Sequence, residues 1–228
     1  MKTRKVPAAE LSRRAIASAV AGAFIMAGLP AVVPGADAIP VVSRVAGKVS
    51  IQSATGDARP VDTAERTNDG DTLTTQAGGL ADVIFGDIGR TRLGPQSVVR
   101  VERTTGDPNV RVVSGALCVD VKRTAFTVDA GSLTIASIAA PTIFSVIDDA
   151  AGPVVVVYQG KVKAGGASSP ITATAGDAFG LNADGIPTLT DFGPLQSRLT
   201  ALNCPAPAVI GRAQALAASP AALASGSA

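Results

Sequence analysis

The sequence predicts an all-β fold, built as a solenoid-like or sandwich-like stack of short strands with a short C-terminal helix. Between Val41 and Asp191 almost no segment has helical period. Short β-branched runs alternate there with polar residues, which is typical of half-buried strands. Glycine, proline, asparagine and aspartate recur between the runs as turn residues. Regularly spaced short strands favour a sandwich, a barrel or a β-solenoid over an α/β fold.

Composition restricts both the class of protein and the kinds of catalytic or metal site that the chain can form. The 228 residues are 46% hydrophobic, 17% charged and 3% aromatic, with 24 glycines and 15 prolines. These values exclude collagenous, disordered and coiled-coil chains and indicate one domain, or one domain with a tail. The lack of histidine excludes Ser-His-Asp and Cys-His catalysis and histidine metal sites. Five of the 20 basic residues lie before residue 15, so the remainder is nearly neutral and does not suit nucleic acid.

Residues 1–38 predict an export signal. A basic leader precedes an uncharged apolar stretch over residues 15–33, and a small-x-small pattern ends at Ala38. This order is typical of a secretory signal, here cleaved between Ala38 and Ile39. The alternative is a retained membrane anchor, although Pro30 interrupts the apolar stretch.

The export route stays open. Residues 12–16, Ser-Arg-Arg-Ala-Ile, resemble the twin-arginine signal, but Ala17 stands where that signal usually has a larger apolar residue. General export is the alternative, in which the arginines only supply positive charge. Either route predicts a periplasmic or extracellular protein without stable membrane insertion once the signal is cleaved.

Apolar rows predict the individual strands, because successive side chains of a strand point to opposite faces. A continuous run, Val154–Tyr158, predicts a strand covered on both faces. The alternating rows are Val45, Gly47, Val49 and Ile51; Ala81, Val83 and Phe85; Val99 and Val101; and Leu117, Val119 and Val121.

A loose internal sequence repeat indicates stacked strand-turn units. The triplet Gly-Lys-Val at residues 47–49 returns at residues 160–162. A Gly-Asp step follows each triplet, at residues 70–71 and 176–177. The alternative is that glycine simply begins many strands.

Residues 192–228 predict a helix and then a tail rich in alanine and proline. Pro194 suits the first helical position. The predicted organisation is an export signal (1–38), an all-β domain (39–191) and this C-terminal segment. The leucines of the helix follow at spacings of four and three, at Leu195, Leu199 and Leu202.

The two cysteines, Cys118 and Cys204, are expected to pair, because an exported chain folds in an oxidising compartment. Leu117 and Val119 face the core, so Cys118 points to the outer face of its strand. Cys204 follows the leucine stripe, so a bridge would hold the helix against the sheet. The alternative is that Cys118 is a small buried apolar residue and Cys204 a free thiol.

No residues indicate catalysis, a cofactor or a metal site. Without histidine, a serine or cysteine lacks its usual base. The carboxylate pairs Asp69 with Asp71 and Asp148 with Asp149 lie among turn residues, where aspartate commonly caps the backbone. A calcium loop around residues 68–71 would lack the spaced ligands and the closing glutamate.

Arg90 and Arg92 form the candidate partner surface. Alternation places both side chains on one strand face, where they could meet an anionic polymer or an acidic protein. The alternative is the solvated outer face of a sheet, whose charges also discourage edge-to-edge pairing.

Several short segments with strand and turn character follow one another in a fixed order. The first are residues 70–75, 81–85 with Gly89, and 93–97, and later ones are residues 115–117, 144–146, 160–162 and 175–177. In their order and spacing these segments resemble the FecR domain over roughly residues 42–182. The chain departs from the family pattern at residues 140–143, where Ala-Pro-Thr-Ile stands in place of the usual Arg-Gly-Thr.

The resemblance implies an extracytoplasmic all-β domain. The name-giving members are membrane regulators that control a sigma factor through a cytoplasmic helical segment. Only about fourteen residues precede the apolar stretch here, so we expect an exported, non-enzymatic FecR-like domain without that segment. Its expected role is protein interaction or envelope sensing, with an envelope protein as partner. The alternative is a carbohydrate- or cell-wall-binding structural protein, although only Tyr158 and a few phenylalanines could stack on a sugar polymer.

Overall fold

The computed structural model describes residues 39–204 except 105–106, 124–125, 167–169 and 191–192. The predicted signal, including Ala38 of the cleavage pair, lies outside the described residues, and so does the tail beyond Cys204. The cleavage site, the export route and the domain boundaries therefore stay predictions.

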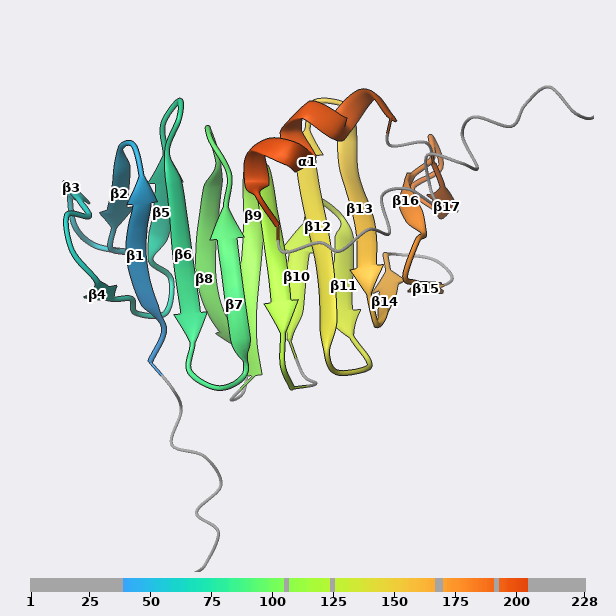
Figure 1. Cartoon of the computed structure of the whole chain (residues 1–228), viewed down its shortest axis with the longest axis horizontal. Coiled ribbons are helices and arrows are strands. Elements are labelled where there is room, and N and C mark those ends of the chain that lie inside the picture. Colours follow the sequence, from blue (N-terminus) through green and yellow to red (C-terminus); the bar gives the residue numbers. More distant parts are fainter. Residues whose placement is uncertain (1–38, 105–106, 124–125, 167–169, 191–192, 205–228) are drawn as a thin grey trace, which may run out of the picture. The chain divides into compact units, whose positions relative to one another are not determined.

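The described residues form seventeen strands in two layers, and one long strand, β9 (Asp107–Val121), belongs to both layers. Sheet A has the order β4-β1-β6-β7-β9-β12-β13-β16-β17, and sheet B has the order β3-β2-β5-β8-β9-β10-β11-β14-β15. All neighbours are antiparallel except β9 and β10. In Figure 1 sheet A lies in front of sheet B. The all-β prediction is confirmed, in its sandwich-like form.

The strands are short, as the sequence predicts. Sheet A contains β1 (Val41–Ala46), β4 (Glu65–Arg66), β6 (Leu80–Phe85), β7 (Gly89–Leu93), β12 (Thr142–Asp149), β13 (Gly152–Gln159), β16 (Ala178–Leu181) and β17 (Pro187–Leu189). Sheet B contains β2 (Val49–Gln52), β3 (Ala58–Pro60), β5 (Thr72–Thr75), β8 (Val98–Thr104), β10 (Thr127–Ala130), β11 (Leu133–Ser137), β14 (Lys161–Gly165) and β15 (Ile171–Thr174).

Strand β9 crosses from sheet B to sheet A. Its first half pairs with β8 and β10, and its second half pairs with β7 and β12. Gly115 lies at the crossing with φ +100, and a Cβ there would overlap Ser97. The buried Ser97 hydroxyl donates to the Ala116 carbonyl (3.0 Å) and accepts from the Ala116 N–H (2.9 Å). Gly115 therefore lies at a bend inside one strand.

The main core lies between the two sheets. The rows that begin at Ala81, Val99 and Leu117 are buried there, as predicted. The prediction for the first row is only partly confirmed, because Val49 and Ile51 are buried but Val45 is 47% exposed. The register of β1 shifts between Arg44 and Ala46, and the chain turns before β2, so Val45 does not continue the buried row.

The two copies of the internal sequence repeat have similar positions in the structure. Gly47 (φ +62) and Gly160 (φ +78) each lie where the chain passes from sheet A to sheet B. In the Gly-Asp steps, Asp71 accepts a hydrogen bond from the Asn68 N–H, and Asp177 accepts one from the Thr174 N–H, both at 2.7 Å. These segments share local turns, in which a side chain caps the backbone.

The C-terminal helix lies on the outer face of sheet A, across β9, β12 and β13 (Figure 1). A 3-10 turn, η1 (Gly193–Leu195), leads into α1 (Gln196–Leu202), which buries Leu199 and Leu202 as the leucine stripe predicts. Asn203 ends the helix with a left-handed backbone (φ 45). Among the described residues, no helix has the length and apolar character needed to cross a membrane.

Candidate functional site

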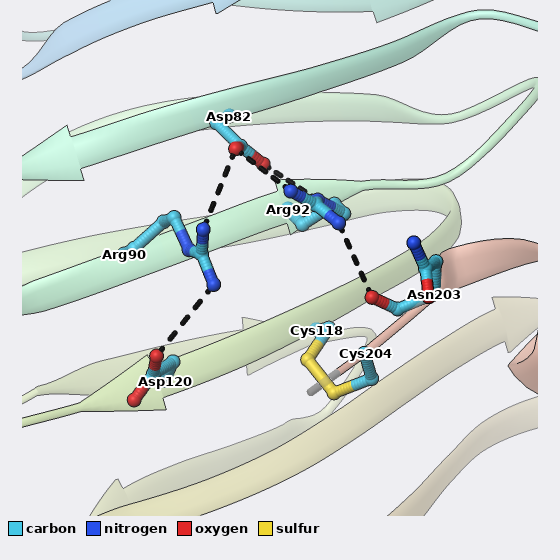
Figure 2. Close-up of polar contacts among 7 residues, drawn as sticks. All are labelled: Asp82, Arg90, Arg92, Cys118, Asp120, Asn203 and Cys204. Atoms are coloured by element: carbon cyan, nitrogen blue, oxygen red, sulfur yellow. Dashed lines mark hydrogen bonds and ion pairs between the residues drawn. A yellow bond between two sulfur atoms is a disulfide. The ribbon is translucent and has the colours of Figure 1, made fainter. Parts of the chain in front are cut away.

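Four charged side chains form a cluster on the outer face of sheet A, beside the end of α1. Asp82 comes from β6, Arg90 and Arg92 come from β7, and Asp120 comes from β9. Strand register sets their contacts, because Asp82 pairs with Arg92 and Arg90 pairs with Asp120. Figure 2 shows the two arginines on one face of β7. Alternation alone predicts that common face, but the acidic partners come from other strands.

Arg92 is the more tightly held arginine. Its Nε and Nη2 donate to the two carboxylate oxygens of Asp82 at 2.7 and 3.0 Å, which is a bidentate arrangement. Its Nη1 donates to the Asn203 carbonyl at 3.2 Å, at the C-terminal end of α1. The side chain is 15% exposed, and the hydrogen bond to Asp82 raises the pKa of Arg92 despite partial burial. Arg92 therefore links sheet A to the helix and offers little surface to a partner.

Arg90 remains more accessible. Its guanidinium lies 3.7 Å from a carboxylate oxygen of Asp82 and 3.7 Å from one of Asp120, with 34% of the side chain exposed. Opposite it on β6 is Ile84, which is 42% exposed on the same face. We call Ile84 and Arg90 the β6–β7 patch. It combines an apolar side chain with a cation whose ion pairs are loose enough to exchange.

The disulfide closes the other half of this face. Cys118 and Cys204 are bridged with Cα atoms 5.7 Å apart, as the sequence predicts, so the alternative of a free tail thiol is wrong. Cys118 points to the outer face, yet it is only 2% exposed because α1 covers it. Strand register places Cys118 directly beside Arg92 (Figure 2).

Beneath α1 lies a second apolar cluster that is separate from the main core. It contains Ala116, Cys118, Ile143, Ile147, Val156, Tyr158, Ala178, Leu199 and Leu202. The sequence offered Tyr158 as a residue that could stack on a sugar, but Tyr158 is buried here, and the buried Ser145 hydroxyl donates to its oxygen at 3.1 Å. Burial raises the pKa of Tyr158, and the contact with Ser145 opposes part of that rise. The double-sided burial of Val154–Tyr158 was the available signal, and that prediction is confirmed for Val155 onward.

Among the aspartates that were considered for chemistry, Asp71 and Asp149 make structural hydrogen bonds. Asp149 accepts hydrogen bonds from Arg198 of α1 (2.6 Å) and from the Ala151 N–H (2.9 Å). Desolvation, and then the charge of Asp149, raise the pKa of Asp148. Within the part of the chain that the structure describes, no three His, Cys, Asp or Glu side chains gather to hold a metal ion.

Comparisons with known proteins find similar solved structures. Two crystal structures of a "putative anti-sigma factor" from Parabacteroides distasonis ATCC 8503, at 1.65 and 2.50 Å resolution, are similar to this chain. Each has 19% sequence identity and a TM-score of 0.45, and the similarity covers 52% of this chain and 58% of that protein's chain. No curated protein matches the sequence.

A family comparison matches part of the domain. Residues 71–163 match the family model described as FecR protein. This range lies within residues 42–182, where the sequence resembles that family, and it runs from the start of β5 to β14. It contains the crossing strand β9 and every residue of the charged cluster. Over residues 71–163, the chain is therefore similar to FecR proteins.

Proposed function

We propose that this protein is an exported FecR-type module that binds an envelope protein through the β6–β7 patch. The family match supports an envelope-sensing role. The patch lies within the matched residues, 71–163. The observation that carries the proposal is the division of the outer face of sheet A. The disulfide and α1 cover one half, whereas on the other half Ile84 is exposed and Arg90 is partly exposed.

Placement outside the cytoplasm is part of the same proposal. The Cys118–Cys204 disulfide supports it, because such bridges form and persist in oxidising compartments. The protein should then be recovered from the periplasm or the medium, with a mass that corresponds to a start at Ile39. An intact Met1 in a washed membrane fraction would contradict cleavage.

The chemistry of the patch suits a protein partner. Ile84 offers apolar area, and a partner carboxylate could replace Asp120 or Asp82 at the Arg90 guanidinium. Arginine is enriched at interfaces because its planar group binds carboxylates and also packs against apolar surfaces. The tightly paired Arg92 holds the neighbouring strands in place while Arg90 is available to bind.

The test is in-cell crosslinking with a matched control. The variant Ile84→Ser/Arg90→Gln removes the patch, and Arg111→Gln/Val113→Ser makes the same type of change on the outer face of sheet B. Arg111 and Val113 are exposed on β9. Ile84 is exposed and Arg90 is partly exposed, so both double variants should fold. A discrete crosslinked partner should disappear only with the first variant.

Two results would contradict this proposal. The first is a partner that both variants retain. The second is retention of the wild-type protein on purified cell-wall polymer with no discrete protein partner, which would favour the cell-wall-binding alternative. Equal thermal midpoints of the two variants establish that any difference in binding is not due to unfolding.

A further inference from the structure

A concave site lies at the end of the sandwich formed by β1, β2 and β3, which appear together at the left of Figure 1. Its volume is about 450 Å³, which is within the range of ligand-binding pockets. Arg44 of β1 and Lys48 of the turn that follows it form one wall, and β3 forms another through Arg59. The charged cluster of sheet A does not line this site.

The pocket adjoins an open strand edge. Strand β4 pairs with β1 only at Val41 and Val42. Among the described residues, no strand pairs with that side of β1 from Ser43 to Ala46. Val45 is 47% exposed there. An edge with free N–H and C=O groups can accept an added strand from another polypeptide.

The charges around this edge are predominantly positive. Arg44, Lys48 and Arg59 line the pocket, and Asp62 is the acidic residue among its lining residues. Arg59 forms an ion pair with Glu65, whereas in the described part of the chain neither Arg44 nor Lys48 forms one. Arg44 Nη1 donates only to the nearby Gly47 carbonyl, at 3.3 Å. Two cations beside the open edge are therefore available to an incoming anion.

We propose that this end of the sandwich binds an extended acidic peptide of a partner protein. The peptide adds as a strand to the free edge of β1, and its carboxylates contact Arg44 and Lys48. Alternate side chains of such a strand point to the same side, so an alternating acidic and β-branched sequence places its charges together. The open backbone edge favours a peptide over a small anion, because a free anion would not use it.

This inference does not rest on the proposed function, since it concerns a different surface. Nucleic acid does not fit, because Asp62 and Glu65 lie within or beside the same small patch and the domain is nearly neutral. Charge complementarity also gives the binding a salt dependence that an apolar groove would lack.

The experiment titrates the protein spanning residues 39–228 with a fluorescent peptide that alternates glutamate and valine. Arg44→Glu/Lys48→Glu should weaken the affinity by about tenfold or more, because two attractions become repulsions. Lys163→Glu, an exposed change on β14, is the matched control and should leave the affinity unchanged. Arg90→Gln should also leave it unchanged, which separates this site from the β6–β7 patch.

A second peptide tests strand addition without altering the protein. It has the same charge, but proline replaces each valine, which removes backbone donors. We expect it to lose most of the affinity. Equal binding of both peptides, absence of binding, or an affinity that Arg44→Glu/Lys48→Glu leaves unchanged would overturn the proposal. Self-association that the same charge reversal abolishes would show that the edge takes a second copy of this chain, which would also overturn it.

Discussion

At the residue scale, the outer face of sheet A depends on which partner each polar side chain finds. Arg90 and Arg92 are adjacent positions on one strand face, yet only Arg92 has the bidentate contact with Asp82 and the link to Asn203. Strand register produces this difference, because it places Asp82 opposite Arg92 and Ile84 opposite Arg90. The two arginines thus have separate roles: one connects elements, and the other is available to a partner.

Tyr158 provides a pH-dependent prediction at this scale. It is the only tyrosine, and the chain has no tryptophan, so its titration can be followed alone. Burial raises the pKa of Tyr158, so the tyrosinate absorbance of the folded protein should appear above the ordinary value of about 10. The folded state then keeps a proton that the unfolded chain loses. The contribution of Tyr158 to the free energy of unfolding should therefore be fully present below pH ~10. It should be lost as the pH rises through the raised pKa.

The control is Tyr158→Phe, which keeps the ring and removes the ionisable group. Its stability should fall less steeply at alkaline pH than that of the wild type, measured by urea unfolding at each pH. A tyrosinate midpoint equal to that of free tyrosine would contradict the burial of Tyr158 beneath α1.

At the element scale, α1 is too short to be stable alone, and tertiary contacts hold it in place. Leu199 and Leu202 pack on the apolar cluster, the disulfide fixes its C-terminal end, and Arg198 contacts Asp149 at 2.6 Å. The helix in turn covers apolar side chains on the outer face of a sheet whose inner face already forms the main core. Docking of α1 therefore gives sheet A two buried faces in this region.

Removing the disulfide should loosen this element. Cys118 and Cys204 are separated by 86 residues, and the chain-entropy model gives roughly 4 to 5 kcal/mol for a closed loop of that size. The Cys118→Ala/Cys204→Ala variant should lower the free energy of unfolding by up to about that amount. Its Tyr158 fluorescence should also become more accessible to acrylamide. Unchanged quenching would show that the apolar cluster holds α1 without the bridge.

At the scale of the whole domain, β9 joins the two layers, so the geometry of its bend affects both sheets. Gly115 has φ +100, and Ser97 occupies the space where a side chain would begin. Residues on either side of the bend pair with different strands, with Val112 in sheet B and Leu117 in sheet A. A distortion there would disturb two hydrogen-bonded ladders at once.

Gly115→Ala should therefore be strongly destabilising. A positive φ alone costs about 1 to 2 kcal/mol for a residue with a Cβ, and displacement of Ser97 should add roughly 1 to 3 kcal/mol. Gly78→Ala is the matched control, because Gly78 also has a positive φ (+71) but open space around its Cα. Thermal unfolding should show a clearly larger loss for Gly115→Ala, and equal losses would mean that the bend relaxes without cost.

The sequence by itself determined the strand chemistry and most of the core rows, and it predicted the cysteine pair. Period-two alternation sets which side chains share a face, so Leu117 and Val119 could be assigned to the core and Cys118 to the opposite face. Two cysteines and one leucine stripe then leave few ways to place the helix. These features are local, or follow from the number of residues available.

Only the tertiary structure decided where a strand bends, which strands become neighbours and which charges meet. A glycine such as Gly115 permits a positive φ, which is compatible with a turn between strands or with a bend inside one strand, and only the structure shows the bend. Arg90 and Arg92 look equivalent until register brings Asp82 and Asp120 beside them from β6 and β9. The open edge of β1 depends on the place where β4 stops pairing. Each of these features arises from contacts between distant segments, which alternation along one strand does not encode.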